Sequence, residues 1–370
     1  MRGMGRPEVS EQLYFSGSQM ELARAAVAAA LGADADEIML NEAAGVGINV
    51  VANGIDWAPG DAVIITDHEH PSNLVPWWAL AQRRGIEVER VADELPGSAD
   101  DPRPNPDAAI LAGLERVLAS RGPRARLLSF SHVSRRTGAR LPAREMTALA
   151  HKHGCRVLID GAQAFGAIPV DVKALGCDYY TVNGHKYCMG PTGTGAVYIA
   201  HDKLDTVLPS WVGCHGEVPG TEEALDGFEL LPSARRFEFG SRNISDHAGW
   251  RAALEVWHGV GWPRVFDAIA ELTGYVKARL QTIEGLTVST PAAYEASSTI
   301  VAFAIEGLAG EEIVRRCQER GVLIAASEGR AARLSAHVYN TAAEVDRLVG
   351  VLAELQAEAV AEVEAQSARL

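Results

Sequence analysis

Short runs rich in apolar residues alternate along the chain with longer segments in which apolar residues recur at helical spacing. The runs Asp61–Thr66, Leu127–His132 and Arg156–Asp160 have the character of strands that are buried on both faces of a sheet. The segments Glu21–Leu31 and Glu145–Gly154 have the spacing of amphipathic helices. Strands that alternate with helices predict an α/β fold with a mostly parallel sheet flanked by helices.

The C-terminal third of the chain has a different pattern, in which strands and helices are spaced as in a smaller α+β unit. The predicted elements are helices at Asp246–Val260, Pro263–Gln281 and Gly310–Arg320, strands at Leu286–Ser289, Thr299–Ile305 and Val322–Ala325, and a closing helix from Ala342. The 370 residues exceed the ~250–300 residues at which a single hydrophobic core stops growing. We therefore predict a large domain over residues 14–255 and a small C-terminal domain over residues 256–370, with residues 1–13 as a candidate segment to pack on the small domain.

Composition and charge narrow the class of protein. Lys and Arg number 34 against 48 Asp and Glu, a net charge of −14, which argues against nucleic acid or an anionic membrane as the main partner. No uncharged apolar run approaches the ~18 residues of a membrane span. The five cysteines form no C-x-x-C pair, and their odd number argues against a disulfide framework. A cytoplasmic protein is expected.

Candidate chemistry follows the strand that ends at Asp160. Lys186 lies in a later loop, and the glycine-rich Gly190–Gly195 precedes another apolar run. An aspartate, an amine and a glycine loop suit pyridoxal phosphate (PLP), because the aspartate keeps the pyridine nitrogen protonated and the lysine forms a Schiff base. Backbone N–H groups of the glycine loop would hold the phosphate. Singly, these features are more often a cap, a solvated lysine and a tight turn; together they predict PLP as the cofactor.

The order and spacing of Asp160, Gly184-His185-Lys186 and Gly190–Gly195 resemble the class V PLP-dependent aminotransferases. This fold-type I group contains cysteine desulfurases, isopenicillin-epimerase-like proteins and cysteine-conjugate lyases. The resemblance extends from about Tyr14 to about Leu355. It implies a PLP-dependent transferase fold, with the mostly parallel sheet in the large domain, and it implies no metal ion.

By this resemblance, catalysis rests on Lys186, Asp160 and His70. Lys186 is the Schiff-base lysine and the general acid and base, and Asp160 lies beside the pyridine nitrogen. His70, within the sequence EHPSN, stacks on the pyridine ring, and Ala162 packs on the opposite face of the ring. Gln163 contacts the phenolic oxygen of the cofactor.

The resemblance also implies the phosphate site and the assembly. Asn183 and His185 approach the phosphate, and the Ser241 hydroxyl reaches the phosphate bound by another protomer, which implies a homodimer with shared active sites. The family usually has hydroxyl side chains before the first helix of the large domain, and this chain has alanine and glycine there. Ala44 and Gly45 are therefore expected to contribute backbone N–H groups at a helix start.

Arg333 matches the family's arginine that binds the α-carboxylate of an amino-acid substrate, a bidentate role suited to guanidinium. The alternative is a surface ion-pair residue. Arg135 and Arg136 follow the strand at Leu127–His132, where cysteine desulfurases have an asparagine. They are predicted to add positive charge beside the substrate, and two solvated loop arginines are the alternative.

The type of reaction is less well defined by the sequence. Cysteine desulfurases carry a mobile cysteine shortly before the carboxylate-binding arginine, whereas Gly321–Arg330 contains none, and Cys317 is predicted to be a core residue of a helix. The favoured function is therefore a β-eliminating C–S lyase that acts on an S-substituted cysteine. An aminotransferase or epimerase of a bulky amino acid is one alternative, and a non-catalytic scaffold with the PLP fold is another.

Overall fold

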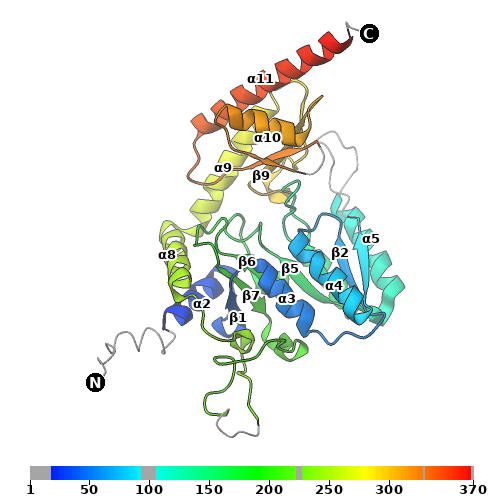
Figure 1. Cartoon of the computed structure of the whole chain (residues 1–370), viewed down its shortest axis with the longest axis vertical. Helices are drawn as coiled ribbons and strands as arrows, with labels where there is room; N and C mark the ends of the chain where they lie inside the picture. The colour runs from blue at the N-terminus through cyan, green and yellow to red at the C-terminus, as the bar shows by residue number, and fades with distance from the viewer. Residues whose placement is uncertain (1–17, 93–105, 222–226, 328–329, 368–370) are drawn as a thin grey trace, which may run out of the picture.

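A computed structural model of the chain describes residues 18–92, 106–221, 227–327 and 330–367. The larger part is built on a seven-stranded sheet with the strand order β1-β7-β6-β5-β4-β2-β3 (Figure 1). The strands are β1 (Ile38–Asn41), β2 (Ala62–Thr66), β3 (Glu87–Val91), β4 (Ala125–Ser131), β5 (Arg156–Asp160), β6 (Tyr179–Asn183) and β7 (Gly195–Ile199). Strands β2 to β6 run parallel to one another, and β7 is antiparallel to both β6 and β1. The predicted mostly parallel sheet is confirmed.

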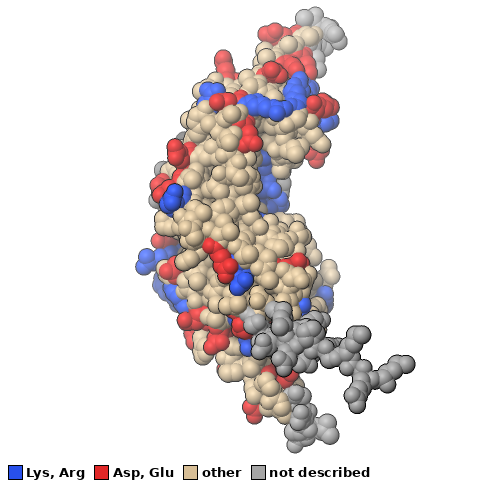
Figure 2. Space-filling view, turned by 90° about the vertical axis from the view of Figure 1, so that its left-hand side faces the viewer, with Lys and Arg blue, Asp and Glu red and all other residues tan. Residues whose placement is uncertain are grey.

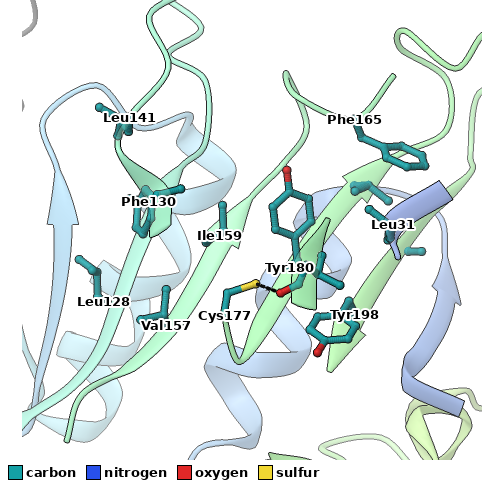
Figure 3. Packing of buried hydrophobic residues seen from close by; sticks show 14 of the residues in the cluster. Leu31, Leu128, Phe130, Leu141, Val157, Ile159, Phe165, Cys177, Tyr180 and Tyr198 are labelled. Atoms are coloured by element: carbon teal, nitrogen blue, oxygen red, sulfur yellow. Dashed lines mark hydrogen bonds between the residues drawn. The ribbon is translucent and has the colours of Figure 1, made fainter. Parts of the chain in front are cut away.

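Helices cover both faces of this sheet because alternate residues of each strand point to opposite faces. Ile64, Phe130 and Ile159 belong to one core cluster, whereas Ile65 and Leu158 belong to the other. Figure 3 shows part of the first cluster. The covering helices are α2 (Ser18–Leu31), α5 (Pro106–Arg121), α6 (Ala143–Lys152) and α8 (Ile244–Val260) on the first face, and α3 (Ala44–Gly54) and α4 (Val75–Arg84) on the second. We call this part, residues 18–260, the large lobe.

The small lobe, residues 262–367, has an antiparallel sheet with the order β10-β11-β9-β8. Its elements are α9 (Trp262–Leu280), β8 (Leu286–Val288), β9 (Ile300–Ile305), α10 (Gly310–Glu319), β10 (Ala325–Ala326), β11 (Ala332–Ser335) and α11 (Ala342–Ser367). Cys317 is fully buried in the core of this lobe, as expected. The domain boundary predicted after residue 255 falls within α8, and residues 1–13 lie outside the described residues.

One predicted strand is largely wrong. Val322–Ala325 was expected to be a strand, but only Ala325–Ala326 pairs with β11. The side chain of Leu323 is 82% exposed, so the apolar residues that suggested a buried strand lie instead in a loop at the edge of the sheet. Leu323 and Ile324 of this exposed loop line a cavity at the candidate site.

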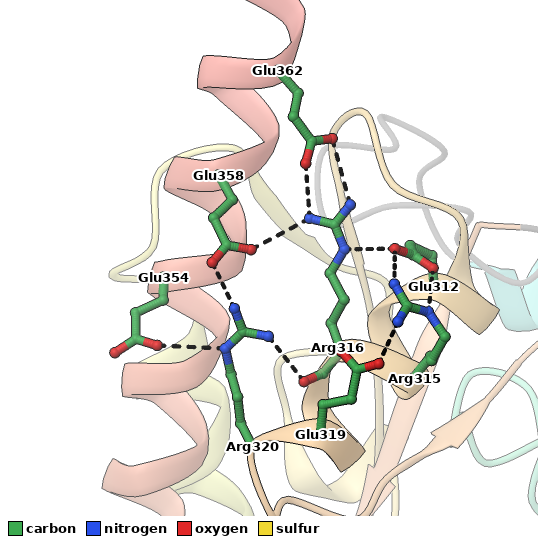
Figure 4. Close-up of polar contacts among 8 residues, drawn as sticks. All are labelled: Glu312, Arg315, Arg316, Glu319, Arg320, Glu354, Glu358 and Glu362. Atoms are coloured by element: carbon green, nitrogen blue, oxygen red, sulfur yellow. Dashed lines mark hydrogen bonds and ion pairs between the residues drawn. The ribbon is translucent and has the colours of Figure 1, made fainter.

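The helices α10 and α11 of the small lobe are joined by arginine–glutamate pairs (Figure 4). Arg316 contacts Glu312, Glu358 and Glu362, and Arg320 contacts Glu358 at 2.6 Å. A single exposed ion pair contributes only ~0–1 kcal/mol to folding stability, so these pairs stabilise the lobe mainly because they form a network. It fixes how α11 packs on α10.

The two lobes are tied by the segment that follows β4. The Arg140 backbone N–H donates to the Ala296 carbonyl at 3.0 Å, and its Nε donates to the Ser297 carbonyl at 2.5 Å. The Thr290 hydroxyl donates to the Thr137 carbonyl at 2.6 Å. Figure 2 shows a hollow between the two ends of the molecule, with Lys and Arg atoms on its wall.

Candidate active site

A cavity of about 290 Å³ lies at the edge of the sheet where the parallel strands β2, β4, β5 and β6 end. This is where ligands bind in open parallel sheets, because the loops that follow the strands meet there. The predicted site residues that line the cavity are Ala44, Gly45, His70, Arg135, Asp160, Ala162, Gln163, Asn183, His185 and Lys186. Arg136, Arg333 and Ser241 are not part of this lining.

Asp160 ends β5 and is buried, and its Oδ1 accepts a hydrogen bond from the Ala162 N–H at 2.9 Å. Burial raises the pKa of the Asp160 carboxyl, while the Ala162 N–H and the charge of Lys186 act in the opposite direction. A buried carboxylate is costly unless a cation lies beside it. A protonated pyridine nitrogen would be such a cation.

Lys186 lies in a loop that is closed on itself. The Gly184 N–H donates to the Thr194 carbonyl, and the Gly190 N–H donates to the Gly184 carbonyl, both at 2.8 Å. Burial lowers the pKa of the Lys186 amine; the charge of Asp160 raises it, and those of Arg333 and Arg135 lower it further. A lowered pKa provides the neutral amine that a lysine nucleophile or base needs.

The turn after Asp160 rests on a buried pair that the sequence did not reveal. A Cβ on Gly161 would lie 2.1 Å from the ring of Tyr180, so only glycine allows the turn to lie against this ring. The Tyr180 hydroxyl is 2.9 Å from His132 Nδ1. Burial lowers the pKa of His132 to about 4, so the imidazole that is paired with this hydroxyl is neutral. This pair supports the turn that brings the Ala162 N–H to Asp160.

His70 precedes a short 3₁₀ turn and caps it. Its Nδ1 accepts the Ser72 N–H at 3.1 Å, which leaves Nε2 as the protonated nitrogen of the neutral ring. Partial burial lowers the pKa of His70, so the ring that lines the cavity is neutral.

Glu69, the first residue of the EHPSN motif, anchors the loop that carries His70. Its buried carboxylate accepts hydrogen bonds from Thr66 at 2.5 Å, Asn73 at 2.7 Å, and the N–H and hydroxyl of Ser131 at 2.8 and 2.7 Å. Burial raises its pKa to about 7. The loop after β2, which carries His70, is thereby fixed to the end of β4.

The start of α3 offers an anion site of limited size. The Ala44 N–H is donated to Asn183 Oδ1 at 2.9 Å. Gly45, the second residue of α3, has an N–H without a partner in the helix, where the helix dipole favours an anion. A Cβ on Gly45 would lie 3.4 Å from the Ser72 hydroxyl, which also lines the cavity. His185 Nδ1 is buried and has no hydrogen-bond partner among the described residues.

The residues that line the first cavity fit the chemical groups of PLP. A buried carboxylate, an amine of lowered pKa, a helix start and the orphaned His185 nitrogen line one cavity. The set matches a cofactor that has a basic ring nitrogen, an aldehyde and a phosphate.

The glycine-rich loop Gly190–Gly195 has a different role from the one predicted. Among the described residues that line the cavity, none comes from this loop. A Cβ on Gly190 would lie 2.7 Å from Trp250, and one on Gly195 would lie 2.7 Å from the Ala43 Cα. The glycines therefore allow close packing of α8 and of the start of α3 rather than holding an anion.

Arg333 lies on β11, where its Nη1 donates to the Arg135 carbonyl of the large lobe. It lines a second cavity of about 260 Å³ together with Leu323, Ile324 and Gln163. Gln163 also lines the first cavity, so the two cavities meet at this side chain.

Two further predicted residues lie apart from the first cavity. The Arg136 carbonyl accepts the Ser327 hydroxyl at 3.3 Å, and the Arg136 side chain lines neither cavity. Ser241 is exposed. Its expected place at the phosphate of a partner protomer stays a prediction.

Comparisons with known proteins identify the family. The family described as Aminotransferase class-V matches residues 5–348, so the chain belongs to it and is a PLP-dependent enzyme of this class. The cysteine desulfurase of Klebsiella pneumoniae is 32% identical over 357 residues, covering 92% of this chain and 83% of the relative. A probable cysteine desulfurase of Xylella fastidiosa is 30% identical over 353 residues, covering 91% and 80%.

Solved structures show the same relationship and establish the fold as PLP fold type I. The cystine C–S lyase C-DES, in complex with its reaction product cysteine persulfide, has a TM-score of 0.83 at 26% identity and covers 94% of this chain and 88% of its own. A lysine-to-alanine mutant of C-DES, with glycine covalently linked to the PLP cofactor, has a TM-score of 0.84 at 26% identity. The match covers 95% of this chain and 89% of the mutant's chain. The cysteine desulfurase of Thermococcus onnurineus has a TM-score of 0.82 at 27% identity over 96% and 87%.

In the described parts of the chain, no helix has both the length and the apolar character needed to cross a membrane. Nor do the described residues bring three or more His, Cys, Asp or Glu side chains together in a way that could hold a metal ion.

Proposed function

We propose that the chain cleaves the C–S bond of an S-substituted cysteine by β-elimination. The observation that carries the proposal is the pair of joined cavities, with Lys186 in the first and Arg333 in the second. An amino acid whose amine is at Lys186 and whose carboxylate is at Arg333 spans both. Its substituent then lies in the second cavity, which is wide enough for a group larger than a thiol.

The chain's own residues supply the remaining steps. PLP, when bound, supplies the electron sink that stabilises negative charge at the substrate Cα. Lys186 would hold the cofactor, and once the substrate amine had displaced it there, its freed neutral Nζ would remove the Cα proton. Asp160 would keep the positive charge at the pyridine nitrogen, and Gln163 would present its amide to the phenolic oxygen. The Cβ–S bond breaks with its electron pair going to sulfur, and Lys186 returns the proton to the leaving thiolate. Water converts the three-carbon remainder to pyruvate and ammonia.

The distribution of cysteines supports elimination over transfer of sulfur to a protein thiol. The loop Gly321–Arg330 before Arg333 contains no cysteine. Cys317, which precedes it, is fully buried, and burial raises its pKa to about 11. A thiol in this state is a poor nucleophile.

The second cavity also supports a choice of substrate. Leu323, Ile324 and Leu334 give it apolar walls, and Arg333 gives it one cationic group. Such a lining favours a carboxylate beside an apolar S-alkyl or S-aryl group. We propose, in addition, that the enzyme is a homodimer in which Ser241 completes the phosphate site of the partner.

The test is a product analysis of the purified holoenzyme. S-alkyl and S-aryl cysteines are expected to give equal amounts of pyruvate and ammonia without an added keto acid. An aminotransferase would release a keto acid only with an amino acceptor, and an epimerase would give the D-amino acid. A protein that binds PLP but changes none of these substrates would be a scaffold. Any of these three results, or L-cysteine or L-alanine as the best substrate by kcat/KM, overturns the proposal.

A further inference from the structure

Three residues of the small lobe share one face of an extended segment and all point to the large lobe. Arg333 and Ser335 belong to β11, and His337 follows two positions later, so the three alternate along the chain. Arg333 donates to the Arg135 carbonyl. His337 Nε2 donates to the Tyr187 carbonyl at 2.9 Å, and the Ser335 hydroxyl lies close enough to the Tyr187 hydroxyl to lower its pKa.

Tyr187 receives two of these contacts and is the residue directly after Lys186. Its ring is parallel to that of His337, with a centroid distance of 6.2 Å and an angle of 7°. Its hydroxyl donates to Gln163 Oε1 at 3.1 Å. Burial raises the pKa of Tyr187 to about 12, so this hydroxyl stays protonated and remains a donor.

The Tyr187 hydroxyl fixes which end of the Gln163 amide faces the substrate. Because Oε1 accepts the tyrosine proton, the amide nitrogen is the end left to donate into the cavities that Gln163 lines. An N–H donor is what an anionic oxygen requires.

His337 is held in one protonation state and one orientation. It is 3% exposed and lies between the rings of Tyr187 and Tyr339, with a centroid distance of 4.8 Å to Tyr339. Burial lowers its pKa, so the ring is neutral and its single proton is on Nε2, the nitrogen that donates to Tyr187. Trp257 secures the next residue of the loop by donating to the Cys188 carbonyl at 3.0 Å.

We propose that Tyr187 and His337 are positioning residues that set Lys186 and Gln163 in register with Arg333. The inference rests on the proposed roles of Lys186 and Arg333, and it does not depend on the type of reaction. The small lobe holds the peptide after the lysine with His337, while the same extended segment presents the guanidinium. The contact between His337 and Tyr187 therefore fixes the separation of the Lys186 amine and the Arg333 guanidinium. An amino acid that bridges the two cavities binds between these two groups.

The experiment compares variants that separate the hydrogen bond from the ring. His337→Phe keeps a ring against Tyr187 but removes the donor, and His337→Gln keeps an N–H donor but removes the ring. Tyr187→Phe removes one oxygen atom and is expected to fold. Tyr275→Phe is the matched control, because the Tyr275 hydroxyl donates to Asp346 of α11, at 2.7 Å, within the small lobe.

The first readout uses the apo-protein. Lys186 is labelled with trinitrobenzenesulfonate over a range of pH, and the labelled peptide is quantified by mass spectrometry. The charged groups that face Lys186 are Asp160, Arg135, Arg333 and His70, and none is changed. His337→Phe is expected to raise the midpoint by about one pH unit, because a loosened loop admits water to the amine, and His337→Gln is expected to restore it.

The second readout is exchange of the substrate Cα–H in D₂O by the holoenzyme with L-alanine. Here kcat is expected to fall about tenfold in His337→Phe, the change that one pKa unit gives in the neutral amine, and to fall also in Tyr187→Phe, which releases the Gln163 amide, while KM changes less than about twofold. Unchanged midpoint and kcat in both variants would overturn the proposal, as would a Gln variant no better than the Phe variant. Exchange and labelling need no elimination product, so failure of the proposed reaction gives a different result.

Discussion

The N–H of Ala44 is donated to Asn183 Oδ1 over 2.9 Å, so the residue that ends β6 closes the first turn of α3. This hydrogen bond takes up one of the two backbone groups that were expected to hold the cofactor phosphate. What remains at this end of the cavity is the Gly45 N–H, the His185 ring and the Ser72 hydroxyl. The phosphate is therefore expected to depend on a side chain that comes from the loop after β2.

Ser72→Ala is expected to weaken PLP binding at least about tenfold, the loss of one hydrogen bond to a charged group at about 1.5 kcal/mol or more. The affinity is measured by titrating the apo-protein with PLP and following protein fluorescence. Ser120→Ala is the control, because the Ser120 hydroxyl donates to the Val117 carbonyl of its own helix, apart from the cavity. Equal affinities in both variants would remove Ser72 from the phosphate site.

Asp160→Asn is expected to slow Cα–H exchange of amino acids more than about a hundredfold, a loss of ~3 kcal/mol of transition-state stabilisation. The asparagine oxygen can still accept the Ala162 N–H, so the turn and the cofactor affinity are expected to be retained. Exchange is followed by NMR in D₂O, and cofactor content by absorbance. A variant that lost PLP but kept the exchange rate per bound cofactor would contradict the role assigned to Asp160.

The two arginines at the substrate end are expected to differ in effect. Arg333→Ala should raise KM for every amino-acid substrate, because the α-carboxylate is common to all. Arg135→Ala should weaken only substrates whose distal polar or anionic group turns back into the first cavity, because Arg135 lines that cavity and adds charge there. KM and kcat are measured for a series of S-substituted cysteines with and without a terminal carboxylate. An unchanged ranking in Arg135→Ala would rule out this division of roles.

Lys277 provides a prediction about stability. Its buried Nζ donates to the carbonyls of Pro291 and Ala292 and to the Ser297 hydroxyl, none of which is charged. Burial lowers its pKa to about 8, so the unfolded chain binds more protons than the folded chain between pH 8 and about 10.5. The contribution of Lys277 to the free energy of unfolding is therefore expected to rise with pH across this window.

The measurement compares the wild type with Lys277→Met in urea at several pH values. The difference in free energy of unfolding is expected to shift in favour of the wild type by about 2 to 3 kcal/mol between pH 7 and pH 10. Lys203→Met is the matched control, because Lys203 is paired with Asp202 and its pKa is raised instead. A difference that stays constant with pH would show that Lys277 does not titrate in this range.

The sequence predicted what depends on short-range pattern. Arg156–Asp160 forms a strand with those bounds, the sheet is mostly parallel, and the family and its cofactor are as expected. Asp160 could be identified because it ends a recognisable strand, and Lys186 because it lies in a loop just before another. Parallel strands bring their carboxyl ends to one edge of the sheet, so the two residues were expected to lie together.

The rest could not be predicted, because it depends on contacts between distant segments. The Gly190–Gly195 loop has the composition of an anion site, yet it packs on Trp250, which lies far along the chain. Ser72 gains its place only because α3 brings Gly45 next to it. Tyr187 and Glu69 are ordinary residues by composition, and their contacts with His337 and Ser131 come from other strands or from the other lobe.

The segment after β4 is held by the small lobe at several points. Arg333 grips the Arg135 carbonyl, Ser327 the Arg136 carbonyl, and Thr290 the Thr137 carbonyl. If the small lobe rotates, these hydrogen bonds therefore move the segment after β4 with it. The Arg333 guanidinium therefore keeps its distance from the backbone of Arg135 whether the lobes stand apart or together, and this end of the site moves as one rigid piece.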